Sequence, residues 1–385
     1  MTTIKEFVEA ASKRLKEEFA PLADALGPLT GGPVLRNGAP ATMNVSTPNH
    51  GVATMERVKS AVASKTAVEE LKELDVSDLP RWKRALQQSR SSSYAAYFPF
   101  LLAHHRPGKR TMLVTEDSGS LCVFIRRDRK RGSHIDLFLN PIPMDVGVTR
   151  RCLERANDLN HDRTARILRI DGNDAALAAQ IPGLELRERR KQYLYAPRAF
   201  GDLEGGKYRT LRYHVGRIRR MKGLEVVPYD EQYAPACREL LSRWAKYHRS
   251  MFGTSGDAGM SKRALALTTT LGAPDLIGEL ILLDGRLVSY AFGGEIRPGL
   301  GCLYEAKTDL AVTGLTYFQC YSFLSKLDPF ELVNGGSDAR RAGVGQLKDS
   351  LRPAAFVAQF ADSWPDQVEG QAAALRTVSH SSRGS

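Results

Sequence analysis

The spacing of apolar residues predicts helices at the start of the chain. Between residues 2 and 26, apolar side chains recur every three or four positions with Lys and Glu between them, which is typical of an amphipathic helix. Residues 27–51 are rich in Gly, Pro, Asn and Thr and predict a loop. A second helix is expected over residues 53–74, and a third begins near Ser77, which suits an N-cap. Residues 1–90 are therefore predicted to form a helical N-terminal extension.

From residue 112 onward, short apolar runs with turn signals between them predict strands that alternate with helices. Two stretches of this kind follow each other, and two α/β units of similar length with mixed strands favour a duplicated acyltransferase-like fold. We expect a first domain over residues 91–200, a second over 201–368 and a disordered tail over 369–385. The predicted strands are 112–116, 121–125, 135–139, 165–170, 188–195, 224–228, 277–284, 286–296, 302–306, 330–334 and 355–360, and the main predicted helices are 148–158, 174–180, 207–222, 235–247, 314–326 and 344–350.

The composition is ordinary for a globular protein except in its charge. Of the 385 residues, 42% are hydrophobic, and Lys and Arg exceed Asp and Glu by 12. This excess favours a polyanionic partner, although a generally basic, Arg-rich source is an alternative explanation. The five cysteines are odd in number and none forms a C-x-x-C pair, so we expect neither a disulfide framework nor a zinc site.

Targeting and membrane signals are not expected from the pattern. The N-terminus has no apolar signal core, and no run approaches the roughly 18 apolar residues that a membrane span needs. The prediction is a soluble, cytoplasmic protein without integral membrane association and without a bound metal.

Positive charge is concentrated in residues 207–222. This predicted helix carries seven cations and one His without any acidic residue. Uncompensated cations repel each other, which favours a polyanion as partner, while a solvated basic face is the alternative. Two further basic clusters, 126–131 and 187–191, are expected to be exposed turns or phosphate contacts.

A strand end and a Gly-rich loop near the C-terminus carry candidate chemistry. The strand is expected to end at Asn334, the loop leads to Asp338, and Lys348 and Arg352 follow one helical turn apart. A Lys in this position is able to stabilise an oxyanion or a phosphate. The alternatives are a surface cation for Lys348 and a turn or cap residue for Asp338.

Two carboxylates and one glycine motif need separate consideration. Glu295 and Glu305 both follow apolar strand sequence, where a half-buried carboxylate binds an ammonium or acts as a base, the alternative being an edge-facing strand residue. The run Arg340-x-x-Gly343-x-Gly345 matches the pyrophosphate loop of GNAT acetyltransferases, but little chain follows it, so we treat the match as coincidental. No G-x-S-x-G nucleophile elbow is present in the sequence.

Two motifs resemble the phosphatidylglycerol lysyltransferase C-terminal domain family. The stretch 202–217 is similar to that family's D-L-x-G-x-K-[YF]-x-x-x-R-N-x-[IV]-N segment, and 333–353 is similar to its closing motif. The resemblance extends over about residues 97–364. The sequence departs from the family pattern at Tyr213, Gly216, Gly336 and Arg340.

The resemblance implies a tandem GNAT-like fold akin to the Fem peptidoglycan transferases. It also implies that an amino acid moves from aminoacyl-tRNA, as co-substrate without a further cofactor, to a small-molecule amine, hydroxyl or hydroxylamine, or to a lipid headgroup. Lipid-acting members usually carry a long membrane domain, so a soluble acceptor is expected here. An acyl-CoA-dependent GNAT N-acyltransferase and a catalytically inactive nucleic-acid-binding module are the alternatives.

The resemblance and the residue patterns together assign roles. Lys348 is expected to stabilise charge at the ester carbonyl, and Glu305 and Asp338 to act with it at the catalytic centre. Substrate binding is assigned to Asn334, Glu295 and Arg352, and the tRNA phosphates are assigned to Lys207, Arg212, Arg217 and Arg219.

Overall fold

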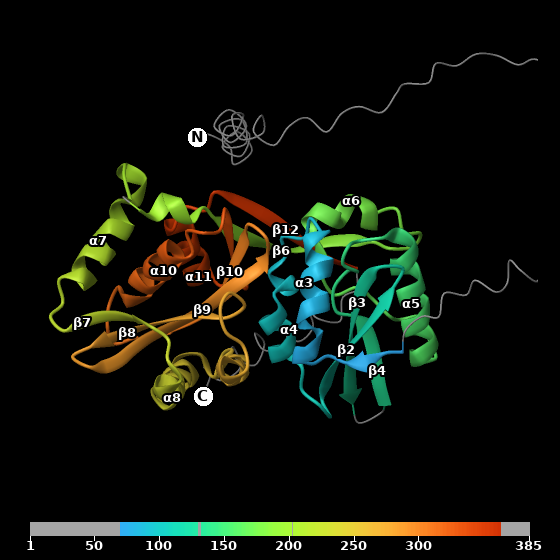
Figure 1. Ribbon diagram of the computed structural model, residues 1–385, viewed down its shortest axis with the longest axis horizontal. Helices are drawn as coiled ribbons and strands as arrows, with labels where there is room; N and C mark the ends of the chain where they lie inside the picture. The colour runs from blue at the N-terminus through green and yellow to red at the C-terminus, as the bar shows by residue number, and fades with distance from the viewer. Residues whose placement is uncertain (1–69, 130–131, 202, 363–385) are drawn as a thin grey trace, which may run out of the picture. The chain divides into compact units, whose positions relative to one another are not determined.

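The computed structural model describes residues 70–129, 132–201 and 203–362, which all lie in one compact unit of the chain (Figure 1). The helix and loop predicted over residues 2–51, most of the second predicted helix and the predicted tail lie outside the described residues. Two sheets with helices on both faces make up the described part, which confirms the mixed α/β prediction.

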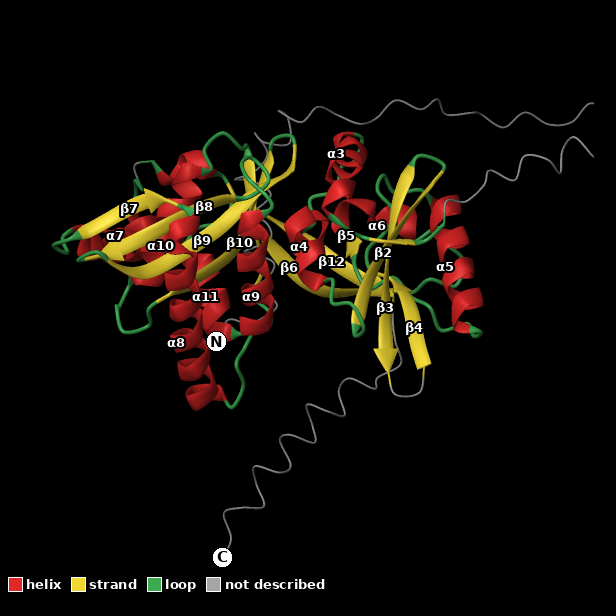
Figure 2. Cartoon of the chain, turned by 60° about the horizontal axis from the view of Figure 1, so that its bottom comes forward, coloured by secondary structure: helices red, strands yellow, loops and turns green. Residues whose placement is uncertain are grey.

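The first sheet has four antiparallel strands in the order β1-β2-β3-β4 (Figure 2). Alternate residues of β2 face opposite sides, so Met112 and Val114 pack towards α3 and α4, whereas Leu113 packs towards α5. The predicted hairpin is confirmed, because the chain turns at Ser118 and Gly119 with φ of 52° and 81°. The elements are β1 (Lys72–Glu73), α3 (Leu79–Gln87), α4 (Phe98–His104), β2 (Arg110–Asp117), β3 (Ser120–Arg129), β4 (Gly132–Leu137) and α5 (Val146–Asn160).

The second sheet has eight strands in the order β5-β12-β6-β11-β10-β9-β8-β7. Ile281 and Val288 pack towards α7 and α10 on one face, and Leu280 and Leu282 pack towards α8 and α9 on the other. The sequence elements are β5 (Ile170–Asp171), α6 (Ala175–Ala178), β6 (Leu186–Tyr195), α7 (Arg209–Arg219), β7 (Leu224–Pro228), α8 (Ala234–Phe252), α9 (Ala258–Ala266), β8 (Ile277–Leu283), β9 (Arg286–Arg297), β10 (Leu300–Thr308), α10 (Leu315–Lys326), β11 (Leu332–Ser337), α11 (Ala342–Ser350) and β12 (Ala355–Asp362).

One pair of strands in the second sheet is parallel and separates partway along its length. The pairing of β10 with β11 runs from Leu300 opposite Leu332 to Cys302 opposite Asn334. Both strands continue, β10 to Thr308 and β11 to Ser337, without pairing to each other. Because the strands diverge there, backbone and side chains of both face an opening in the sheet.

Segments on the two sides of each predicted domain boundary, at residues 90 and 200, pack or pair with one another. Trp82 and Leu86, from the predicted extension, are buried in the same core as β2 and β3. Strand β6 precedes the boundary predicted at residue 200, yet it pairs with β11 and β12 of the second half.

Most predicted elements are confirmed, but several details are wrong. The strand predicted over 165–170 is reduced to β5 and an isolated bridge at Ile167, and helices α4 and α9 were not predicted. The second predicted helix, over 53–74, is wrong at its end, where Lys72 and Glu73 form β1. Ser77 is not an N-cap, because the side chain of Asp75 accepts from the Ser77 amide and caps that turn.

Candidate active site

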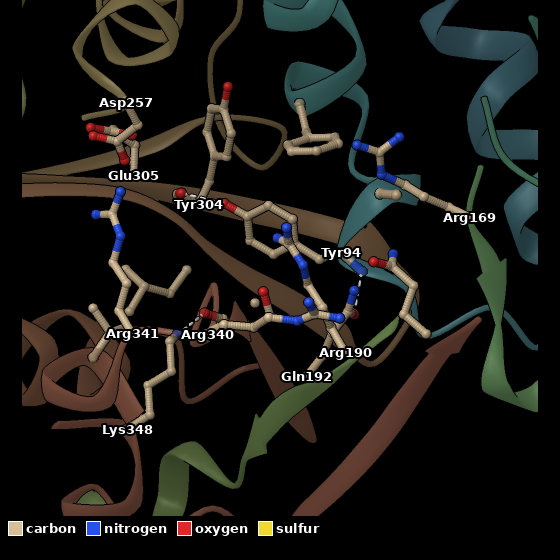
Figure 3. Close-up of a pocket in the computed structure, with 18 of the residues that line it drawn as sticks. Tyr94, Arg169, Arg190, Gln192, Asp257, Tyr304, Glu305, Arg340, Arg341 and Lys348 are labelled. Carbon is tan, nitrogen blue, oxygen red and sulfur yellow. Dashed lines mark hydrogen bonds between the residues drawn. The ribbon is translucent and has the colours of Figure 1, made fainter. Parts of the chain in front are cut away.

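A cavity of about 940 Å³ lies where β10 and β11 separate. Residues 303–308 of β10 and 335–337 of β11 line it, together with side chains from the first half of the chain. Its charges are arranged unevenly: Glu305 and Asp257 lie at one end with Arg341 beside them, and Arg169 lies at the other end (Figure 3). A pocket of this size accommodates a nucleotide-sized ligand.

The middle of the cavity is aromatic. Tyr94 and Tyr304 have ring centroids 6.2 Å apart, and Phe100 packs edge-on against Tyr94 at 5.1 Å. The Tyr94 hydroxyl donates to the backbone carbonyl of Tyr304. The Tyr94 amide donates to Gln192 Oε1 at 2.9 Å, which fixes this segment against β6.

Asn334 supports the cavity wall through hydrogen bonds made outside the cavity. Its side chain is fully buried and does not line the cavity. Its Nδ2 donates to the carbonyl of Ser92 at 2.6 Å and to Gln192 Oε1 at 2.7 Å, while its Oδ1 accepts from the Gly336 amide at 2.7 Å. With these groups already paired, the structure places Asn334 as a positioning residue for Gln192 and the β11 loop rather than in contact with a substrate.

Glu305 lies at the carboxylate end, as the sequence predicts for a half-buried acid. Its side chain is buried, and Lys307 Nζ donates to its Oε1 at 2.7 Å. Asp257 Oδ1 lies 3.3 Å from the same ammonium, and Trp244 supplies a ring face at 4.7 Å. Burial raises the pKa of Glu305, although the charge of Lys307 opposes this shift.

The arginine end gathers cations from separate segments of the chain. The guanidinium of Arg169 stacks over Phe138, with 4.1 Å from its carbon to the ring centroid. Burial, and then the charges of Arg190, Arg127 and Arg110, lower the pKa of Arg169 to about 9. Within the described part of the chain, no carboxylate pairs with Arg169. Arg127 pairs with Asp136, but the buried charge of Arg169 is not compensated in this way, and such a cation favours an anionic ligand.

Lys348 lines the cavity on the side of Arg341 (Figure 3). It lies on α11, and its Nζ donates to the carbonyl of Gly335 and lies 5.6 Å from the ring centroid of Tyr193. Burial lowers the pKa of Lys348. One donor of the ammonium is committed to Gly335, which leaves two for a ligand in the cavity.

Asp338 shapes the loop that precedes α11. Its Oδ1 accepts from the Arg340 amide at 2.9 Å, and its Oδ2 accepts from the Tyr193 hydroxyl at 3.5 Å. Asp338 does not line the cavity. The geometry therefore matches the alternative role, that of a turn residue, more closely than direct contact with a substrate.

Glu295 and Arg352 lie outside the cavity. Glu295 borders a small hollow beside Lys83 and Arg297. Arg352 is exposed, and its Nε donates to the carbonyl of Lys207 at 2.8 Å, so it joins the end of α11 to the segment before α7.

The basic segment 207–222 forms α7 and the turns beside it, close to its predicted bounds, and it packs against α10 (Figures 1 and 2). None of its residues lines the cavity. Arg212 donates to the carbonyls of Leu203 and Gly205, and Arg219 donates to the Tyr321 hydroxyl at 2.6 Å. Arg217 is exposed, as is Lys207.

Several cavity residues were not assigned from the sequence. Arg190 and Arg127 belong to the basic clusters noted there, so a signal existed for them. Arg169 stands alone between Leu168 and Ile170 and gives no such signal. Trp244 and Asp257 reach the cavity only through the fold of α8 and α9.

Residues 70–129, 132–201 and 203–362 contain no group of three His, Cys, Asp or Glu side chains placed to hold a metal ion. No helix in these ranges is both long and apolar enough to cross a membrane.

The fold is a tandem GNAT-like, Fem-like acyltransferase fold, and solved structures share it. A conserved protein of unknown function from Bacteroides thetaiotaomicron VPI-5482 is 19% identical with a TM-score of 0.63, over 76% of this chain and 98% of that one. The C-terminal domain of a putative lysylphosphatidylglycerol synthetase from Agrobacterium fabrum is 17% identical with a TM-score of 0.55, over 80% and 99%. FemX is 10% identical with a TM-score of 0.54, over 75% and 96%.

The sequence also matches a family directly. Residues 92–318 match the family described as phosphatidylglycerol lysyltransferase, C-terminal, and the chain belongs to this family of aminoacyltransferases. The match confirms the resemblance seen at 202–217, and it ends before the closing motif at 333–353. No curated protein matches the chain.

Proposed function

We propose that this protein transfers an amino acid from an aminoacyl-tRNA to a soluble acceptor, a small-molecule amine, hydroxyl or hydroxylamine, or to a lipid headgroup. One observation carries the proposal: a single cavity has the carboxylates of Glu305 and Asp257 at one end, and at the other end a group of arginines in which Arg169 has no carboxylate partner among the described residues. The 3′ end of a charged tRNA has the matching polarity, because it joins phosphates to an ammonium through one ribose. Membership of a family whose name specifies lysyl transfer supports the same class of reaction.

In this proposal the donor lies across the cavity. Phosphates of the terminal nucleotides contact Arg169 and Arg190, where bidentate charge-assisted hydrogen bonds are available. The aromatic side chains of Tyr94 and Phe100 flank the ribose and base. The aminoacyl group then points towards Glu305.

An aminoacyl ester is already activated, so the enzyme has to position the acceptor and stabilise charge. The acceptor nitrogen or oxygen attacks the ester carbonyl carbon, the bond to the ribose oxygen breaks, and the acceptor's proton passes to that oxygen. Lys348 donates to the carbonyl oxygen as its negative charge develops. The proton transfer is assisted by the substrate itself, and Glu305 holds the aminoacyl ammonium.

Helix α7 is proposed to contact the tRNA away from the cavity. The exposed cations of α7 and of the turn before it, with Arg217 and Lys207 as the principal ones, form a basic surface that suits the phosphates of the acceptor stem. Arg212 and Arg219 contribute mainly by holding the helix to the loop before it and to Tyr321.

The proposal is tested with a mixture of charged tRNAs. The mixture is incubated with the protein and candidate acceptors, and products are identified by mass spectrometry. The expected result is transfer that ribonuclease abolishes and that removal of coenzyme A thioesters leaves unchanged. Turnover with purified acetyl-CoA in the absence of RNA overturns the proposal in favour of an acyl-CoA-dependent N-acyltransferase. Binding of tRNA without any deacylation or transfer overturns it in favour of an inactive nucleic-acid-binding module.

A further inference from the structure

The carboxylate end of the cavity contains a binding site for a primary ammonium, and the protein's own Lys307 occupies it. Lys307 Nζ lies 2.7 Å from Glu305 Oε1, 3.3 Å from Asp257 Oδ1 and 4.7 Å from the centroid of the Trp244 ring. Two carboxylates and an aromatic face are the groups that recognise an alkylammonium ligand. The site is therefore complete, and its occupant is covalently part of the chain.

This arrangement is built from three elements inside the fold. Glu305 and Lys307 lie two residues apart on β10, so their side chains share a face of the strand. Asp257 precedes α9, and Trp244 lies on α8. The Lys307 side chain is only 5% exposed, which separates this pair from an ordinary surface ion pair.

The ammonium of Lys307 is retained in its charged form. Burial opposes the charge, but the carboxylates of Glu305 and Asp257 outweigh it, so the pKa of Lys307 is raised. A cationic aminoacyl side chain that enters this end would meet that charge. Lys307 already takes Oε1 of Glu305 and lies 3.3 Å from Oδ1 of Asp257, so the remaining carboxylate oxygens serve the α-ammonium that every aminoacyl donor carries. The described cavity lining holds ten Arg and Lys side chains but three carboxylates, and the third, Asp362, has a partner of its own.

We propose that Lys307 determines the donor's amino acid: it fills the cation subsite, so the cavity takes aminoacyl groups with an uncharged side chain and rejects lysyl and arginyl groups. This inference rests on the proposed function and narrows its substrate class. It also sets this chain apart from what the name of its family suggests, because a lysyl side chain needs the place that Lys307 holds.

The subsite is tested without any transfer reaction. Lys307→Ala leaves a hole beside two carboxylates, so n-butylammonium is expected to bind and raise the melting temperature by about 3–5 °C in a saturable way. Neutral n-butanol is expected to have no such effect. Lys307→Met removes the charge but refills the hole, and it is expected not to respond to the amine. Lys83→Ala removes the lysine of another ion pair, Lys83–Asp275 at 2.6 Å outside the cavity, and serves as the matched control.

Each result of this test has a defined meaning. A response to n-butylammonium in Lys307→Ala alone supports the proposal. A stable Lys307→Ala protein without that response, or an equal response in the wild type, overturns it. If Lys307→Ala folds poorly, its refolding yield with the amine is compared with its yield with butanol, and equal yields overturn the proposal.

Donor selection gives the second measurement. With lysyl-tRNA and an uncharged-side-chain aminoacyl-tRNA in competition, the wild type is expected to prefer the uncharged donor, and Lys307→Gln is expected to lose that preference by about tenfold. An unchanged ratio overturns the specificity role. If no donor is used at all while the amine result holds, the proposed function fails and the cation subsite stands. If transfer occurs but the amine and competition results are negative, the proposed function stands and the role of Lys307 fails.

Discussion

Two cationic regions of this protein differ in almost every respect except charge. The α7 region is a continuous run in sequence, lies outside the cavity, and uses Arg212 and Arg219 in contacts within the protein. The cavity arginines come from separated segments, converge on a concave site, and leave Arg169 without a carboxylate partner in the described residues. Exposed charge is screened by salt within about 8 Å, whereas charge in a cleft is focused. Under the proposed function, α7 attracts the tRNA and the cavity fixes its 3′ end.

The largest expected effect comes from the cavity. Lys348→Ala should reduce single-turnover transfer by about 100-fold or more, because a donor aimed at a developing oxyanion acts mainly in the transition state. Affinity for charged tRNA should change little, since other cations carry it. Rapid-quench assays with saturating enzyme separate the two quantities.

The control for this variant is Lys326→Ala, which removes an exposed lysine of α10. Lys348→Arg should rescue poorly, because a planar guanidinium does not replace a point charge in a confined site. If Lys348→Ala transfers at nearly the wild-type rate and only tRNA affinity falls, Lys348 is a phosphate contact. Lys348 would then contribute to tRNA binding, as proposed for α7, and not to catalysis.

Arg169→Met is the second test and concerns ground-state binding. A CCA trinucleotide reaches only the cavity, so its affinity should fall by about tenfold or more when the crowded guanidinium is removed. The unliganded variant should melt at the same or a higher temperature, because mutual repulsion among Arg169, Arg190, Arg127 and Arg110 is relieved. Arg163→Met, at an exposed loop position, is the matched control. If calorimetry shows that the affinity for CCA is unchanged, the proposal of an anion site at Arg169 in the cavity is wrong.

The sequence alone was sufficient to predict the α7 helix and many of the other helices and strands. Leu211, Val215 and Ile218 are buried at helical spacing, and this local pattern defined the helix nearly to its ends. Lys348 was also placed correctly at a cavity beside a Gly-rich loop, because strand ends in α/β sheets are where ligands bind.

The rest of the site depends on contacts that sequence spacing does not encode. Glu295 and Glu305 have similar local contexts, but only Glu305 lines the cavity, and a register shift between Leu303 and Glu305 on β10 re-aims the side chains there. Asn334 was expected to end its strand, but β11 continues to Ser337, and burial against Ser92 and Gln192 turns Asn334 inward. Arg169 acquires its significance only from neighbours remote in sequence.

A smaller effect of Lys348 is expected in the pH dependence of transfer. Burial lowers the pKa of Lys348, so the ammonium loses its proton at a lower pH than an ordinary lysine does. If the charged form is required, the single-turnover rate should fall by several-fold as pH rises through that lowered pKa, at a lower pH than the titration of an ordinary lysine. Lys348→Ala should lose this limb of the profile. Hydrolysis of the ester without enzyme, measured in parallel, is subtracted, and a limb that persists in Lys348→Ala belongs to another group.

The smallest expected effect is the contribution of α7 to tRNA affinity. Arg217 is the residue at which the charge is removed without loss of a contact within the protein. Arg212→Ala would also release the carbonyls of Leu203 and Gly205, so a loss of binding would mix charge with local structure. Arg217 is exposed and has no such contact in the described chain. Arg217→Ala should weaken full-length tRNA by about two- to threefold and reduce the slope of log affinity against log salt by about one, which is the loss of one phosphate contact. CCA trinucleotide affinity should stay constant, in contrast to Arg169→Met. An unchanged salt slope for full-length tRNA would show that α7 is a solvated basic face and that the cavity alone binds the donor.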